Sequence, residues 1–438
     1  MNYSPAKTLV FFFLFLIVVG TILLSLPISI NPNEEISIFS NLFTSVSAVC
    51  VTGLSVVSIV HHYSVFGQIV IMFLMETGAL GYMFVSTAAA IVFGRMSLKD
   101  RRIMQELFDI TSYKDLKKLL LKAIFFVLAV EGIGAFSLTL LYLQKFSFLK
   151  SLYLGIFSSI TAFCNSGFAL FDDSMISFAN SPSILFVFTI LIIAGGLGFF
   201  VMVDIYDTYK ENRLHLSLHT KVVIYATIII MALSILFFMI EGGSSFFKGK
   251  GFFYSISNSI FNAASARTAG FTTIETSAFS EFSKFFIILI MAIGAAPASA
   301  TGGLKVTTLA IVIAFVRSFV RSDNDVVLFK RRIPEDLVQK AAVIFIVFVL
   351  LLAAFTAVLI LFEPHKKPID LLFETVSAFA TTGLSINLTT QNLSIGGQWT
   401  IIFAMLTGRI GILTLLLSII KTKKISRIKY PTERLMAG

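Results

Sequence analysis

FTSVSAVCVTGLS, residues 43–55, is the first of four similar stretches that recur along this chain of 438 residues. The other three are FSSITAFCNSGFAL at 157–170, FNAASARTAGFTT at 261–273 and FETVSAFATTGLS at 373–385. Each contains one glycine followed by a large apolar residue, and these glycines are Gly53, Gly167, Gly270 and Gly383. Because the glycines lie 114, 103 and 113 residues apart, the sequence indicates a fourfold internal repeat of roughly 110 residues.

Each repeated stretch predicts a short helix that enters a membrane and then turns back. About 12 residues at about 1.5 Å per residue make a helix of about 18 Å, whereas the hydrocarbon core is about 30 Å thick. Glycine permits positive φ at the turn, so the following residues can direct carbonyl oxygens at a central axis. Such carbonyls are tolerated inside a membrane only where they line a water-filled path, and four sets of them can replace the hydration shell of K⁺. The alternative is that each glycine only ends a helix, but four copies in register favour an ion filter.

Each turn contributes three candidate filter residues, and their backbone carbonyls are the predicted ligands of K⁺. They are Val51, Thr52 and Gly53; Asn165, Ser166 and Gly167; Thr268, Ala269 and Gly270; and Thr381, Thr382 and Gly383. K⁺ is then the substrate, and we expect neither a bound cofactor nor a catalytic residue.

The composition is that of a protein with many membrane spans, because 57% of the residues are hydrophobic and only 13% are charged. The net charge of +10 does not indicate nucleic-acid binding, because 23 of the 34 Lys and Arg fall in four segments: 94–122, 204–221, 317–340 and 421–438. The positive-inside rule places these segments, and both termini, in the cytoplasm. The two cysteines, Cys50 and Cys164, exclude a disulfide framework and are interpreted as small packing residues.

These patterns predict an all-α integral membrane protein with four tandem units around a pseudo-fourfold ion pore. Each unit has an outer helix, a short pore helix and an inner helix. The outer helices are expected over 7–28, 119–143, 221–241 and 337–361; the pore helices over 40–50, 152–163, 253–266 and 369–380; and the inner helices over 65–93, 184–206, 282–319 and 399–420. The unit limits are 1–94, 95–207 (beginning with a cytoplasmic linker), 208–320 and 321–438 (ending in a basic tail).

The third inner helix contains GAAPASATGGLK at 294–305, which predicts a break. Proline removes a hydrogen-bond donor and glycine adds backbone freedom, so a straight helix is not expected there. Unwound backbone needs water or polar neighbours, which favours a gate beside the ion path over a tolerated kink packed through small residues. The candidate gate residues are Gly294, Pro297, Thr301, Gly302, Gly303, Lys305 and, in the last inner helix, Arg409.

Charged residues inside the bilayer are functional candidates by default. Arg409 has three possible roles: an ion pair with Glu374, hydrogen bonds to carbonyls of 294–305, or a cationic barrier in the pore. Arg267 lies three residues before Gly270 and is expected to point away from the axis toward a carboxylate. Glu76 and Glu131 are expected to make structural hydrogen bonds.

The chain resembles the Trk/Ktr/HKT superfamily of cation transporters, most closely the bacterial Ktr-type membrane subunits. The motifs that carry the resemblance are VCVTGLS at 49–55, ARTAGF at 266–271 and GRIG at 408–411. The resemblance implies potassium uptake across the cell membrane by a homodimer in which each subunit contains a whole pore. It also implies gating by a cytosolic nucleotide-binding ring of RCK subunits, with possible Na⁺ dependence or symport. Glycine rather than serine at Gly53 is associated in the family with K⁺ over Na⁺.

Two other classes of function remain as alternatives. A secondary transporter with a midplane substrate site needs an ionisable cluster there, and only Glu131 and Arg409 are evident candidates. A polytopic membrane enzyme needs clustered polar side chains at one face, and only His215 and His219 approach that pattern. No Walker A, GxSxG or HExxH motif is present, so we expect no enzymatic activity.

Overall fold

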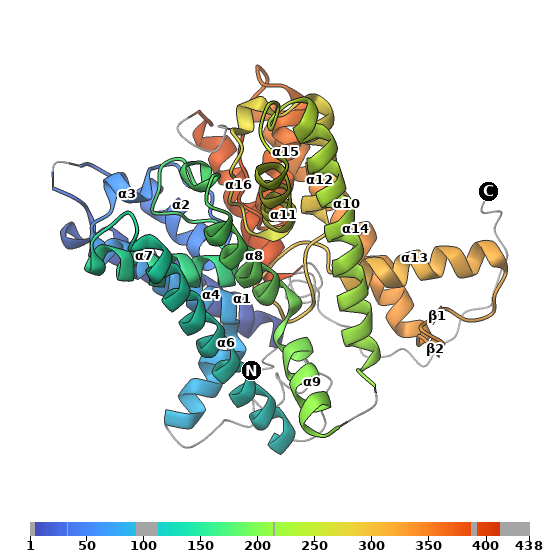
Figure 1. Ribbon diagram of the computed structural model, residues 1–438. Coiled ribbons are helices and arrows are strands. Elements are labelled where there is room, and N and C mark those ends of the chain that lie inside the picture. Colours follow the sequence, from blue (N-terminus) through green and yellow to red (C-terminus); the bar gives the residue numbers. More distant parts are fainter. Residues whose placement is uncertain (1–4, 33, 93–112, 213–214, 387–391, 412–438) are drawn as a thin grey trace.

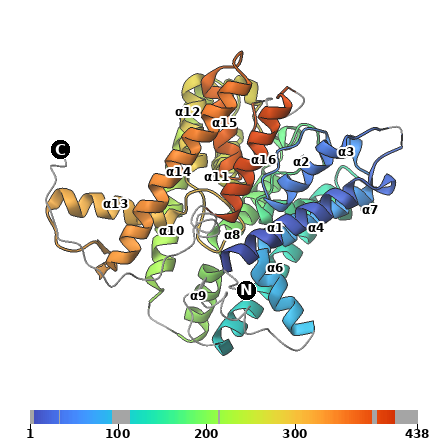
Figure 2. The same cartoon turned by 180° about the vertical axis from the view of Figure 1, so that it is seen from behind.

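A computed structural model describes residues 5–32, 34–92, 113–212, 215–386 and 392–411 of the chain. The described part is helical apart from short connections and one hairpin, formed by β1 (Val327–Leu328) and β2 (Arg331–Arg332). Figures 1 and 2 show the helices gathered into one body, from which α13 (Val306–Arg321) and the hairpin project to one side. The predicted all-α membrane architecture is confirmed.

The outer helices are the long elements of the fold: α1 (Pro5–Leu24), α6 (Tyr113–Tyr142), α10 (Leu218–Ser244) and α14 (Glu335–Phe362). In the described part of the chain these four are long and apolar enough to cross a membrane singly. Their large apolar side chains, such as Phe15, Phe125 and Ile240, are exposed. A soluble protein would bury such residues, whereas an exposed apolar surface of this kind suits contact with lipid tails.

The pore helices are shorter and lie inside the body: α2 (Ile38–Val49), α7 (Phe148–Cys164), α11 (Phe252–Thr268) and α15 (Pro368–Phe379). They have 12 to 17 residues, too few for a full crossing. The phenylalanine that opens each repeated stretch is almost completely buried, in Phe43, Phe157, Phe261 and Phe373. Each anchors its pore helix by apolar packing at an equivalent position.

The inner helices differ from the prediction, because the first three are interrupted and the fourth leaves helical geometry at the last residue described. They are α4 (Val65–Val92), α8 (Pro182–Leu197) with α9 (Phe199–Lys210), α12 (Glu281–Ala292) with α13, and α16 (Ile395–Ile410). We expected a break in the third alone. The chain leaves helical geometry with positive φ at Gly81, Gly198 and Gly411, and α8 and α9 meet at 93°. The predicted fourth inner helix beyond residue 411 lies outside the described residues.

The glycines at these turns belong to a repeated pattern of two glycines three residues apart, which our prediction did not use. Each break glycine comes three residues after another glycine, in GALG at 78–81, GGLG at 195–198 and GRIG at 408–411. A Cβ on Gly78, Gly195 or Gly408 would overlap the carbonyl oxygen of a pore-helix residue, Val49, Phe163 and Phe379 respectively. The first glycine therefore allows close packing on the pore helix, and the second permits the turn away from it.

The remaining elements are one-turn helices in the loops beside the pore helices. They are α3 (Ile59–His62) and the 3₁₀ turns η1 (Pro27–Ser29), η2 (Ile176–Phe178) and η3 (Thr276–Ala278). Ser58 caps α3 by accepting a hydrogen bond from the amide of His61 at 3.4 Å. The unit limits given above stay a prediction.

The substitution Gly195→Ala tests this packing. Because the new Cβ meets the Phe163 carbonyl, we expect the free energy of unfolding to fall by about 1–3 kcal/mol. The midpoint of thermal unfolding of the purified protein should fall with it. Gly132→Ala is the matched control, since Gly132 lies within α6 and has no atom within 4 Å of an added Cβ. The control should unfold at the same or a slightly higher temperature. Equal midpoints for both variants would contradict the proposed contact.

Candidate ion-conduction site

The four repeat glycines meet in a closed ring. All have positive φ, with values of 87° at Gly53, 74° at Gly167, 74° at Gly270 and 90° at Gly383. A Cβ atom added to each would touch the carbonyl oxygen of the residue before the next glycine in chain order. The neighbouring pairs are Gly53 with Ser166, Gly167 with Ala269, Gly270 with Thr382, and Gly383 with Thr52. The sequence predicted that these residues would come together, and the structure brings them together.

Of the three candidate filter residues in each loop, only the glycine is partly exposed to solvent. The two residues before it are buried in all four repeats: Val51 and Thr52, Asn165 and Ser166, Thr268 and Ala269, and Thr381 and Thr382. Val51, Asn165 and Thr381 have left-handed backbone conformations, with φ of 57°, 58° and 52°. The third repeat differs, because Thr268 is still the last residue of α11. The pseudo-fourfold symmetry is therefore closest among repeats one, two and four.

The amides of the loops are satisfied by their own pore helices. Thr52 N donates to Ser47 O at 2.9 Å, Ser166 N to Thr161 O at 3.0 Å, and Thr382 N to Ser377 O at 2.8 Å. In repeat three the bond shifts by one residue, from Gly270 N to Ser265 O at 3.2 Å. Within the described residues, no donor bonds the carbonyl oxygens of Thr52, Ser166, Ala269 or Thr382. These oxygens are left for a ligand in the ring.

Side-chain hydroxyls hold the segments that follow the glycines. Thr161 Oγ1 donates to Phe168 O at 2.8 Å, and Ser265 Oγ donates to Phe271 O at 2.6 Å. Asn165 links two repeats, because its Oδ1 accepts a hydrogen bond from Thr268 Oγ1 at 3.2 Å. The loops are thus fixed by polar contacts as well as by apolar packing, which keeps the carbonyl geometry defined.

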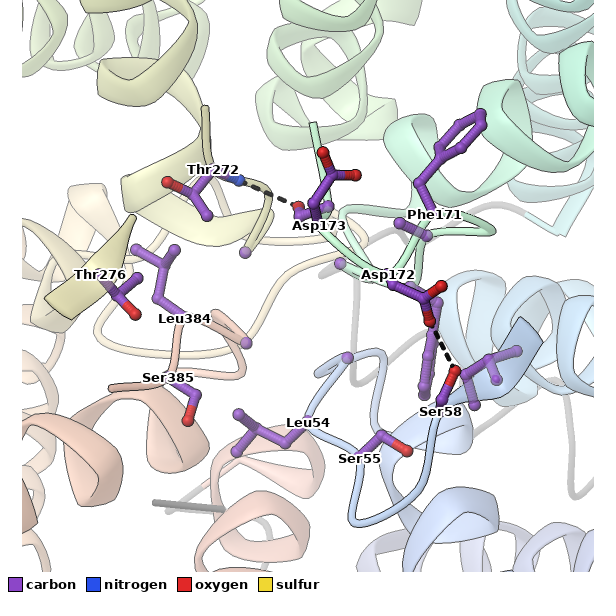
Figure 3. Close-up of a pocket in the computed structure, with 18 of the residues that line it drawn as sticks. Leu54, Ser55, Ser58, Phe171, Asp172, Asp173, Thr272, Thr276, Leu384 and Ser385 are labelled. Atoms are coloured by element: carbon purple, nitrogen blue, oxygen red, sulfur yellow. Dashed lines mark hydrogen bonds between the residues drawn. The ribbon is translucent and has the colours of Figure 1, made fainter. Parts of the chain in front are cut away.

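A wide mouth opens directly onto the ring. This cavity of about 730 Å³ is lined by all four glycines and by the segments that follow them. Figure 3 shows its wall, with Leu54, Asp172, Thr272 and Leu384 each contributed by a different repeat. Its lining includes the acidic residues Asp172, Asp173 and Glu275. Acidic groups at the mouth of a narrow path raise the local concentration of cations.

Two histidines lie at the rim of the mouth and contact acidic side chains. His61 Nε2 is 2.9 Å from Asp172 Oδ2, and Ser58 Oγ donates to Asp172 Oδ1 at 2.9 Å, as Figure 3 shows for Ser58. His62 Nε2 is 3.3 Å from Glu34 Oε2. The contacts with Asp172 join the loops of repeats one and two, whereas the His62–Glu34 contact lies within repeat one. Sequence reasoning did not identify either contact.

The gate segment, residues 294–305, lies against the fourth filter loop. Between Ala292 and Val306 the chain is not helical, and Gly302 N donates to Thr381 Oγ1 at 2.8 Å. Gly303 approaches Ala380, so that an added Cβ would lie 3.3 Å from the Cβ of Ala380. The predicted break is therefore present and lies directly beside the ring.

The gate segment is also bonded to the break in repeat two. Ala296 N donates to Gly196 O at 3.1 Å, and Phe199 N donates to Ala298 O at 3.0 Å. An added Cβ on Gly198 would lie 2.7 Å from Pro297 O. Within the segment, Thr301 Oγ1 is 2.8 Å from Ser299 Oγ, and Lys305 Nζ donates to Thr301 O at 2.5 Å. Two interrupted helices thus satisfy each other's free backbone groups.

Arg409 joins the gate segment to two inner helices. Its Nη1 donates to Ala300 O, and its Nη2 donates to Gly78 O at 2.5 Å and Ala79 O at 3.1 Å. Of the three roles considered from the sequence, the structure supports hydrogen bonds to the gate carbonyls. Glu374 instead accepts hydrogen bonds from Ser385 Oγ at 2.8 Å and Ile386 N at 2.6 Å.

The prediction that Arg267 points toward a carboxylate was wrong. Its side chain is 5% exposed, and its Nε donates to Gly294 O at 3.3 Å rather than to a carboxylate. Among the described residues, it forms no ion pair with Asp or Glu. A carbonyl of the gate segment takes the position that we assigned to an acid, because the unwound chain offers acceptors that a helix would have used internally.

Comparison with known proteins places the chain in a family. The sequence profile named TrkH, described as a cation transport protein, matches residues 5–428. The chain belongs to this family.

Curated relatives match over nearly their full length. The Ktr system potassium uptake protein B of Vibrio alginolyticus is 35% identical, covering 97% of this chain and 93% of the relative. The Ktr system potassium uptake protein D of Bacillus subtilis is 34% identical, covering 99% and 97%. The potassium/sodium uptake protein NtpJ of Enterococcus hirae is 32% identical, also covering 99% and 97%.

A solved structure shares the fold. The crystal structure of the potassium transporter TrkH from Vibrio parahaemolyticus superposes with a TM-score of 0.76, covering 96% of this chain and 86% of that one. The identity is 19%, so this likeness supports the architecture of the TrkH family member described here and not its ion preference.

Arg409→Gln tests whether the guanidinium holds the gate segment. Glutamine is too short to reach Ala300 and the α4 carbonyls together, so we expect faster amide hydrogen exchange over residues 293–305. The loss of roughly two hydrogen bonds from a charged donor predicts an increase of at least about tenfold. Arg321→Gln, at the exposed end of α13, is the control. Unchanged exchange in Arg409→Gln would show that other contacts hold the segment.

Proposed function

We propose that this chain takes up K⁺ across the cell membrane through the ring formed by its four glycine loops. The observation that carries the proposal is the closed ring, in which each glycine lies beside a backbone carbonyl that has no donor within the described residues. Membership of a cation transport family and relatives named for potassium uptake support the same function. The function is transport without enzymatic catalysis, and K⁺ is its substrate.

The proposed path runs from the acidic mouth through the ring to the gate segment. Asp172, Asp173 and Glu275 draw cations into the mouth. The carbonyls of the filter residues then replace the water molecules around K⁺. The preference for K⁺ over Na⁺ is moderate, since each loop offers only a short ladder of carbonyls.

The gate segment closes the path beside the ring. Its hydrogen bonds to Thr381 and to Arg409 must break before the segment can move away. Because Arg409 also bonds α4, movement of any one of three inner helices alters the contacts of the gate. This arrangement suits control from the cytoplasmic side.

The regulatory assembly is part of the proposal. A cytosolic nucleotide-binding RCK ring acts on the gate, and two copies of this chain form a homodimer in the membrane. The names of two relatives refer to a Ktr system, which is consistent with more than one component. Both termini lie in the cytoplasm, as the basic segments predict. If K⁺ uptake is a symport, it requires Na⁺ as the second ion. The name of one relative, the potassium/sodium uptake protein NtpJ, is the reason to test this requirement.

Ion flux in liposomes that contain the purified protein tests the function. Imposed K⁺ gradients should drive flux that exceeds flux under matched Na⁺ gradients. The cytosolic ring should then be added, with and without nucleotide, because a closed gate alone also gives low flux. Absence of K⁺ flux with the ring present would contradict the proposal and favour a transporter with a midplane substrate site.

Gly383→Ser tests the filter. A Cβ at this position meets the Thr52 carbonyl and forces a side chain into a loop with φ of 90°, so the ring cannot keep its geometry. We expect the preference for K⁺ over Na⁺ to fall about tenfold, which corresponds to about 1.4 kcal/mol.

Gly243→Ser is the control, because an added Cβ there has no atom within 4 Å. Competition between K⁺ and Na⁺ in the liposome assay measures the preference. If Gly383→Ser folds and keeps its ion preference, the carbonyls beside Gly383 do not select the ion.

A further inference from the structure

Three side chains that the transport path does not use converge behind the second filter loop. They are Glu76 of α4, Glu131 of α6 and Cys164, the last residue of α7. Each offers one ligand atom, and these atoms all lie within 4.8 Å of one another. Cys164 Sγ is 3.2 Å from Glu76 Oε2. Three helices from two repeats therefore meet at one polar point.

The cluster contains a buried acceptor that lacks a partner. Glu131 is 7% exposed, and its Oε1 has no hydrogen-bond donor among the described residues. No described Lys, Arg or His forms an ion pair with Glu76 or Glu131. Arg409 donates instead to backbone carbonyls. Two carboxyl groups so close in a medium of low dielectric constant need a compensating positive species.

Repeat one provides an internal comparison. Cys50 and Cys164 each lie three residues before a filter glycine, and both are fully buried. Within the described residues, only Cys164 belongs to a group of ligand-bearing side chains. The acidic pair, with one residue from repeat one and one from repeat two, lies beside Cys164 alone and is not required to pack a cysteine behind a filter loop.

We propose that Glu76, Glu131 and Cys164 bind one thiophilic divalent cation of the Zn²⁺ class. Two carboxylates and one thiolate are ligands that Zn²⁺ uses, and a water molecule can complete a tetrahedral site. Binding replaces the thiol proton, and any proton held by the carboxyl groups, with the metal; these protons pass to solvent. Glu76 is the least buried of the three ligand residues.

The thiol distinguishes this ion from the transported one. K⁺ and Na⁺ prefer oxygen ligands, whereas a thiolate favours Zn²⁺ and Cd²⁺. A bound ion would join α4, α6 and α7 at the residue directly before Asn165, the first filter residue of repeat two. The metal would therefore stiffen one filter loop without entering the ring.

Cd²⁺ is the probe for this site, because a Cd²⁺–thiolate bond gives an ultraviolet charge-transfer band. Cd²⁺ is titrated into the purified, reduced full-length protein, and bound metal is counted by equilibrium dialysis. We expect one Cd²⁺ per chain and a thiolate band in the wild type and in Cys50→Ser. Cys164→Ser should lose the band. Glu131→Gln, which keeps the thiol, should weaken binding at least about tenfold, the loss that even an outer-shell partner typically causes.

Three results would overturn the proposal. A wild type without the band would show that the carboxyl groups are compensated by a shared proton alone. A band that persists in Cys164→Ser would place the metal elsewhere. Equal losses in Cys50→Ser and Cys164→Ser would indicate unspecific thiol binding. If Cys164→Ser does not fold, as judged by its thermal midpoint without metal, the Glu131→Gln titration decides the matter.

Discussion

The structure depends on backbone carbonyls in the middle of a membrane protein that receive no hydrogen bond from any residue the structure describes. Such groups are costly in hydrocarbon, so they persist only where a ligand or water reaches them. The four glycine loops place four such carbonyl oxygens in one ring, those of Thr52, Ser166, Ala269 and Thr382. Glycine is required there because the neighbouring loop occupies the space of a Cβ and because φ is positive. The short pore helices and the long outer helices hold these loops in place.

Glycine also links the proposed filter to the proposed gate. Gly78, Gly195 and Gly408 allow three inner helices to pack directly on pore-helix carbonyls, and each of these helices leaves helical geometry at a glycine three residues later. The gate segment forms hydrogen bonds with backbone groups at the break between α8 and α9. Arg409 connects the same segment to α4, close to the break at Gly81. A displacement of the inner helices would thus change the contacts of the gate segment and of the filter together. Small residues make this coupling possible because they leave no side chain between the backbones.

The sequence predicted the features that repeat and missed those that depend on distant contacts. The period of the glycines was enough to predict the number of units, the pore helices and the meeting of the filter residues. The Pro297 region was predicted to break because the signal was local. The turns at Gly81 and Gly198 were missed because two glycines three apart do not exclude a straight apolar helix. The partner of Arg267 was not predicted, since it is a carbonyl of the unwound segment, whereas carbonyls of that segment were one of three alternatives considered for Arg409. The approach of Glu131 to Cys164 likewise depends on how three helices pack.

The most direct test of the account is to locate the permeant ion. Rb⁺ has nearly the size of K⁺ and scatters X-rays anomalously, so crystals grown in Rb⁺ reveal its position. The account predicts an anomalous peak on the axis of the ring, coordinated by the carbonyl oxygens of Thr52, Ser166, Ala269 and Thr382. An empty ring with Rb⁺ bound at another site, such as the Glu76 and Glu131 pair, would contradict the central claim that backbone carbonyls select the ion.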